Sequence, residues 1–165
     1  MFTSSKGRVA VIYLSVLSVL VAGCGDSGAD TSTSAASTQG ESGFGSPADS
    51  GDADRTVEID ASDEFFFDPA DLTVTVGETI TFRVVNDGSL THDFTLGDQA
   101  TQDEHEAEMA EMGEMAHDQP NVVTIPAGET MEITWTFTEA GTVLIGCHQP
   151  GHYAAGMKGL VTVES

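Results

Sequence analysis

Basic side chains are scarce in this chain of 165 residues, which carries 5 Lys and Arg against 27 Asp and Glu. The formal net charge of −22 excludes nucleic acid as a partner, because a nucleic-acid binder needs a basic surface to displace phosphate counterions. Anionic lipid headgroups repel the same charge, so surface electrostatics cannot hold the protein on a membrane. A protein partner that docks by charge is therefore expected to present a basic patch.

Cysteine is equally scarce, since the chain has only Cys24 and Cys147, and their surroundings predict a different role for each.

Long apolar runs are also rare. The most prominent one, Val9 to Ala22, follows the basic residues Lys6 and Arg8 and is broken only by two serines. It falls short of the roughly 20 apolar residues of a comfortable membrane span, and its charge pattern is typical of an export signal.

The end of this run, Val21-Ala22-Gly23-Cys24, resembles the bacterial lipobox, in which cleavage falls before a cysteine that receives lipid. Residues 1–23 are therefore predicted to be a lipoprotein signal peptide, with an ordinary secretory signal as the alternative. Lipid on Cys24 would tether the mature chain to the extracytoplasmic side of a bacterial cell membrane. Residues 24–55 are acidic, rich in Gly, Ser and Thr, and contain one aromatic residue, so they are predicted to form a flexible linker.

Residues 56–165 show the two-residue hydrophobic alternation of β-strands, as in Leu72, Val74 and Val76. The runs are short, and most end at Gly, Pro, Asn or Asp. About seven or eight such strands predict an all-β antiparallel sandwich. The segment near residues 98–118 lacks the alternation and is rich in Ala, Glu and Met, so a partly helical insertion is expected there.

Residues suited to copper lie near the C-terminus. Cys147, His152 and Met157 form a Cys-x4-His-x4-Met pattern. A thiolate, an imidazole and a thioether make a soft ligand set that suits copper, whereas a thioether is a poor ligand for zinc. The second imidazole that such a site needs is predicted to come from His92, which lies between two strand patterns.

These residues, with Phe67-Asp68-Pro69 and the run from Leu72 to Phe82, resemble the cupredoxins, or type 1 blue copper proteins, over about residues 57–164. The loop spacing is similar to that of rusticyanin and auracyanin. The resemblance implies a Greek-key β-sandwich and a one-electron carrier of the cell envelope. It also implies that His152 is the exposed edge through which electrons pass, and that one copper is held by His92, Cys147, His152 and Met157. The sequence shows no evident nucleophile–base pair or open coordination position, so no enzymatic activity is expected.

Two positions depart from the patterns of related proteins. Asp93 stands where plastocyanins and azurins carry an Asn, and its charge near the Cys147 sulfur is expected to favour Cu(II) and lower the reduction potential. His148 directly follows the cysteine, as in multicopper oxidases, but Gly146 replaces the other flanking histidine. Five histidines are too few for the trinuclear cluster of those enzymes. His148 is therefore predicted to be a strand residue that points away from the copper.

The insertion supports an alternative function. Several of its residues would share one face of a helix, and thioethers and imidazoles bind Cu(I). The protein would then carry or buffer copper outside the cytoplasm, using a secondary site. The opposing interpretation is that the methionines only pack against the sandwich. The residues of the secondary Cu(I) site would be His105, Met109, Met112, Met115 and His117.

Overall fold

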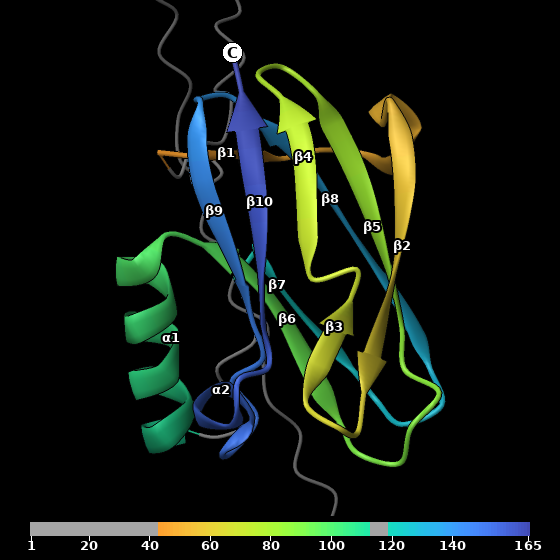
Figure 1. Ribbon diagram of the computed structural model, residues 1–165, viewed down its shortest axis with the longest axis vertical. Helices are drawn as coiled ribbons and strands as arrows, with labels where there is room; N and C mark the ends of the chain where they lie inside the picture. Colours follow the sequence, from red (N-terminus) through yellow and green to blue (C-terminus); the bar gives the residue numbers. More distant parts are fainter. Residues whose placement is uncertain (1–42, 113–118) are drawn as a thin grey trace, which may run out of the picture. The chain divides into compact units, whose positions relative to one another are not determined.

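The structure is a computed structural model that describes residues 43–112 and 119–165. In these residues two five-stranded sheets form a sandwich (Figure 1). One sheet has the order β1-β8-β5-β2-β3, built from β1 (Gly45–Pro47), β8 (Thr130–Phe137), β5 (Thr79–Val85), β2 (Arg55–Ser62) and β3 (Phe66–Asp68). The other has the order β4-β10-β9-β6-β7, built from β4 (Asp71–Thr75), β10 (Lys158–Glu164), β9 (Gly141–Gly146), β6 (His92–Gly97) and β7 (Val122–Ile125). The predicted all-β sandwich is confirmed.

The core consists of side chains that alternate inward along the strands, as the hydrophobic pattern predicted. In β8, for example, Ile133, Trp135 and Phe137 are buried, and each is separated from the next by a more polar residue. The rings of Phe82 and Phe94, from opposite sheets, lie 5.3 Å apart and join the two layers. Burial of each large apolar side chain stabilises the fold by about 1.5–3 kcal/mol, so this core provides a rigid support for the loops at its ends.

The sandwich is not purely antiparallel. Strand β2 pairs with β5 in parallel, with Arg55 opposite Ile80, and β10 pairs with β4 in parallel, with Leu160 opposite Asp71. The predicted antiparallel arrangement was wrong for these two pairs. Hydrophobic alternation shows which face of a sheet a residue occupies, but it carries no information about the direction of the neighbouring strand.

The packed domain begins earlier than the predicted boundary at residue 56. Phe44 is buried and its ring stacks on that of Trp135, with centroids 5.3 Å apart. Strand β1 then pairs with β8, and a short 3-10 helix, η1 (Ser50–Asp52), leads into β2. The predicted linker 24–55 therefore extended too far, because one aromatic residue and three paired residues anchor a segment whose composition resembles a flexible coil.

Replacing Phe44 by Ala is expected to lower the free energy of unfolding by about 3 kcal/mol, because it removes the ring that covers Trp135 and leaves a cavity. Chemical denaturation monitored by tryptophan fluorescence measures the change. Phe66, whose side chain is 43% exposed, provides the control: Phe66→Ala should cost far less. Equal effects of the two substitutions would show that residues 43–47 are not part of the folded domain.

The predicted insertion contains a helix, α1 (Gln99–Met112), between β6 and β7, which are themselves paired neighbours. The helix begins after Asp98, whose carboxylate accepts hydrogen bonds from the backbone N–H (2.8 Å) and the hydroxyl (2.9 Å) of Thr101. It contacts β6 and β9 at the side of the sandwich (Figure 1). No helix within the described residues is long and apolar enough to cross a membrane.

Candidate metal centre

Three of the four predicted copper ligands lie together at one end of the sandwich. His92 is the first residue of β6, Cys147 follows β9, and His152 begins the short helix α2 (His152–Ala155). One potential ligand atom from each lies within 4.8 Å of the others. The Cys147 sulfur is 3.3 Å from Nδ1 of His152 and 3.9 Å from Nδ1 of His92. Both imidazoles thus direct the same nitrogen towards the sulfur.

Met157 is placed next to this cluster by its backbone. Its side chain is fully buried. Its carbonyl accepts a hydrogen bond from the N–H of Cys147 (3.2 Å), and its own N–H donates to the carbonyl of His152 (3.1 Å). These two hydrogen bonds fold the loop from Cys147 to Met157 back on itself, so that both of its ends lie at the site. Coordination by the Met157 thioether remains a prediction.

Burial changes the acid–base chemistry of the three ligands. It raises the pKa of the Cys147 thiol to about 12, although the N–H groups of Asp93 and Gln149 partly offset it. Burial also lowers the pKa of both His92 and His152. The imidazoles are therefore neutral at pH 7 and can bind a metal, whereas the thiol must lose a proton to do so. Two imidazoles and one buried thiolate fit copper, because this set matches the equatorial ligands of blue copper sites.

These shifts predict how the stability of the metal-free protein depends on pH. The Cys147 pKa is raised from 9.0, so its contribution to the free energy of unfolding is complete below pH 9 and is lost as pH rises towards 12. This contribution is on the order of 4 kcal/mol. The pKa values of His92 and His152 are lowered from 6.5, so their contribution is present above pH 6.5 and is lost as pH falls. Stability is therefore expected to be greatest between about pH 6.5 and 9.

Denaturation of the metal-free protein from below pH 6.5 up to pH 12 measures the effect, with Cys147→Ser as the control. The variant has no thiol and should lack the alkaline loss while it keeps the acid loss. An identical decline of both proteins between pH 9 and 12 would contradict the assignment to Cys147.

The edges of the histidine ligands are covered by the turn between β2 and β3. His92 is fully buried, and His152 is only 9% exposed. The ring of Phe65 lies against that of His152, with centroids 4.6 Å apart, and Phe65 holds a left-handed backbone with φ 65°. The expectation that His152 forms an exposed edge was therefore wrong. A side chain from a distant part of the sequence shields it from water.

Asp93 contributes to the site through both its backbone and its side chain. Its N–H donates to the Cys147 sulfur at 3.3 Å. Its carboxylate accepts hydrogen bonds from the Thr124 hydroxyl (3.0 Å) and from the side-chain amide of Gln149 (3.1 Å to each oxygen). Asp93 thus ties the loop after Cys147 to strand β7. The expected lowering of the reduction potential by its charge remains a prediction.

His148 points away from the ligand cluster, as predicted, but it lies in the loop after β9 and not in a strand. Its Nδ1 is 2.6 Å from a Glu106 carboxylate oxygen, and its Nε2 is 2.7 Å from the Gln102 side-chain oxygen. Gln102 also donates to the carbonyls of Thr95 and Leu144. Helix α1 is thereby held to the copper loop by a hydrogen-bond network in which Gln102 and His148 are buried and Glu106 is half-exposed.

The glycine that precedes Cys147 makes room for this network. A Cβ atom at Gly146 would lie 2.3 Å from the Gln102 side-chain oxygen and 2.9 Å from Nε2 of His148. A histidine at this position, as in the oxidase pattern, would displace both side chains. The space beside Cys147 is thus occupied by the insertion.

The residues of the predicted secondary site are only partly described. His105 and Met109 are buried on α1, and the His105 ring meets the His148 ring edge-on, with centroids 5.1 Å apart. Glu106, Met109 and His148 contribute to the lining of a small cavity of about 150 Å³. The side chain of Met112 and all of Met115 and His117 lie outside the described part of the chain.

Four residues at the site were not identified from the sequence: Asp63, Phe65, Gln102 and Glu106. Gln102 had a usable signal, because it shares a helix face with His105 and Met109 at intervals of three and four residues. Asp63 and Phe65 had none. They lie far from the ligands in the sequence, and only the pairing of β2 with β5 brings their turn to the copper end.

The chain is similar to known copper proteins. Residues 53–164 match the model of the copper binding proteins of the plastocyanin/azurin family. The chain is 44% identical over 121 residues to the copper-resistant cuproprotein CopI of Rubrivivax gelatinosus, over 73% of each protein. It is 33% identical over 131 residues to auracyanin A of Chloroflexus aurantiacus, over 70% of this chain and 78% of the relative.

Solved structures show the same likeness. The structure of auracyanin A, described as a "blue" copper protein, matches with a TM-score of 0.58 and 32% identity over 66% of this chain and 98% of that one. The structure of auracyanin B matches with a TM-score of 0.62 and 27% identity over 74% of this chain and 97% of that one.

Proposed function

Because the chain belongs to the plastocyanin/azurin family of copper-binding proteins, we propose that it is a one-electron carrier with a single type 1 copper and no enzymatic activity. The observation that carries the proposal is the buried cluster of His92, Cys147 and His152, whose ligand atoms lie within 4.8 Å of one another. Copper bound there supplies a centre that accepts and returns one electron. The similarity to the blue copper protein auracyanin A supports this class.

The chain's own residues perform four tasks in this function. Cys147 provides a thiolate whose charge is stabilised by the N–H groups of Asp93 and Gln149. His92 and His152 present Nδ1 from β6 and from α2, and the rigid sandwich limits their movement when the charge of the site changes. Phe65 covers His152 and restricts the access of water. Met157 is proposed as the weak fourth ligand.

The proposed location is the extracytoplasmic face of the bacterial cell membrane, with a lipid anchor at Cys24. The lipobox-like end of the N-terminal apolar run supports this location. The proposed redox partner is a protein with a basic patch, because the net charge of −22 would attract it over a distance.

A second candidate function is the carriage or buffering of copper. Two observations favour it. One is the similarity to a copper-resistant cuproprotein. The other is the burial of His105 and Met109 on α1, where the His105 ring meets that of His148 and Met109 lines a small cavity together with His148. An imidazole and a thioether there are suited to Cu(I). In this function the insertion would release and accept copper, while the first site would keep its own.

Titration of Cu(I) into the purified chain, in competition with a Cu(I) chelator, separates the two functions. The electron carrier should take up one tight equivalent and, after oxidation, show an intense visible charge-transfer band that disappears on reduction and returns on reoxidation. Met109→Leu keeps the apolar packing but removes the thioether, so it should leave this result unchanged. Further tight equivalents that Met109→Leu removes would instead establish copper carriage, and no coloured site would overturn the carrier proposal.

A further inference from the structure

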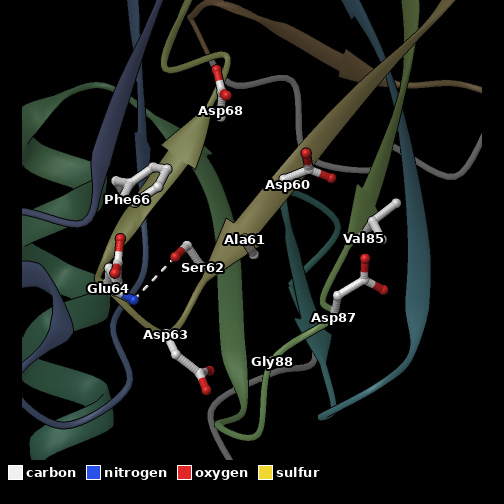
Figure 2. A pocket seen from close by; sticks show the side chains of 10 residues that line it. All are labelled: Asp60, Ala61, Ser62, Asp63, Glu64, Phe66, Asp68, Val85, Asp87 and Gly88. Carbon is white, nitrogen blue, oxygen red and sulfur yellow. Dashed lines mark hydrogen bonds between the residues drawn. The ribbon is translucent and has the colours of Figure 1, made fainter.

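An open groove of about 490 Å³ lies beside the copper end of the sandwich, between the β2–β3 turn and the segment after β5. Figure 2 shows its carboxylates, among them Asp60, Asp63, Glu64 and Asp87, which come from both sides of the groove. Most of these side chains are exposed and are ordinary surface charges. Asp63 differs from the others because its carboxylate is bound by the loop that leads to a copper ligand.

The Asp63 carboxylate fastens this loop with three hydrogen bonds. One oxygen accepts from the N–H and the hydroxyl of Ser89, both at 2.8 Å, and the other accepts from the N–H of Leu90 at 3.1 Å. These three donors hold the carboxylate in one position beside the loop. A Cβ atom at Gly88 would lie 2.2 Å from the carboxylate, so the close approach of the loop requires glycine there.

The same carboxylate faces the copper ligand itself. Oδ1 of Asp63 is 3.6 Å from Nε2 of His92. His92 directs Nδ1 towards the Cys147 sulfur, so Nε2 is the nitrogen left to carry the proton. Nε2 is buried and has no hydrogen-bond partner among the described residues. A distance of 3.6 Å is longer than a hydrogen bond, and a movement of less than about 1 Å would close it.

We propose that Asp63 is a positioning residue for the copper centre. It holds His92 in the tautomer that leaves Nδ1 free for the metal, and its fixed negative charge favours Cu(II) over Cu(I). A carboxylate behind a metal-binding histidine orients the ring and raises its basicity. The part of this inference that concerns the metal rests on the proposed function, whereas the tautomer of His92 is a property of the metal-free chain.

Three variants test the proposal. Asp63→Asn removes the charge but keeps one oxygen, which can still accept the two hydrogen bonds from Ser89, and Asp63→Ala removes both the charge and the acceptors. Glu64→Gln is the matched control, because it removes one negative charge from the same turn and the same groove. The first measurement is the reduction potential, which reports the ratio of Cu(I) to Cu(II) affinity. The second is the ¹⁵N spectrum of the His92 imidazole in the metal-free chain, which reports its tautomer.

Asp63→Asn is expected to shift the affinity ratio towards Cu(I) by about tenfold, which for a one-electron couple raises the potential by about 59 mV. Glu64→Gln should shift it much less, because its charge is screened by solvent. In the metal-free chain, His92 should carry its proton on Nε2, and Asp63→Ala should give a mixture of tautomers. Equal potentials for Asp63→Asn and Glu64→Gln, with an unchanged His92 spectrum, would overturn the proposal.

The two proposals fail in different ways. If the unmodified chain takes up no copper, the proposed function is wrong, and the metal-free spectrum of His92 still decides whether Asp63 sets its tautomer. If the unmodified chain binds copper and the Asp63 variants behave like Glu64→Gln in both measurements, the function stands and Asp63 only anchors the Ser89 loop.

Discussion

Replacing Cys147 by Ser should abolish the visible charge-transfer band and weaken Cu(I) binding by more than the 10–100-fold that typically follows the loss of a residue behind a metal ligand. The thiolate is the soft anionic ligand of the set, and a serine hydroxyl does not ionise near neutral pH. The side chain is fully buried and grouped with the two imidazoles, and it is the only thiol in the described part of the chain. Absorption spectroscopy and competition with a Cu(I) chelator measure the two effects.

Cys24→Ser is the control for this experiment, because it removes the other cysteine of the chain. It should leave the band and the copper affinity unchanged. A band that survives in Cys147→Ser, or that disappears in Cys24→Ser, would contradict the assignment of the metal centre.

Replacing Gln102 by Leu should lower the free energy of unfolding by about 3 kcal/mol, although the side chains are similar in size. Gln102 is fully buried, and its amide contacts His148 and the carbonyls of Thr95 and Leu144. The substitution leaves buried polar groups without this partner, at a cost of about 1–3 kcal/mol for each group that finds no other. It should also release α1 from the copper loop, which proton exchange of the α1 amides would detect.

The matched control is Gln99→Leu in the same helix. Gln99 is exposed and makes one side-chain hydrogen bond, to Asp103, so its replacement should change stability by less than about 0.5 kcal/mol. If Gln102→Leu were as harmless as Gln99→Leu, the insertion would not be anchored through Gln102.

The sequence alone was sufficient to predict the layered architecture, because alternation along strands such as β8 records which side chains face the core. It was not sufficient for strand direction or for the start of the domain. Phe44 sits in a segment with the composition of a linker, and its fit over Trp135 depends on a partner about 90 residues away in the sequence. Composition averages over a segment and cannot identify one anchoring ring.

In the metal centre, too, the sequence predicted some features and missed those that depend on tertiary contacts. His92, Cys147 and His152 were identifiable because their chemistry is rare in this chain and their order matches a known pattern. The groups around them were not, because Asp63 and Phe65 are common residue types that act through tertiary contacts. The burial of His152 under Phe65 shows the consequence: residue identity predicted the ligand, but only the fold determined its exposure.

The most direct test of the central claim is a crystal structure of the copper-loaded chain, with anomalous diffraction measured on both sides of the copper absorption edge. We predict one strong copper peak, enclosed by Nδ1 of His92, the Cys147 sulfur and Nδ1 of His152. A principal peak on helix α1, beside His105 and Met109, with the predicted site empty, would contradict the account.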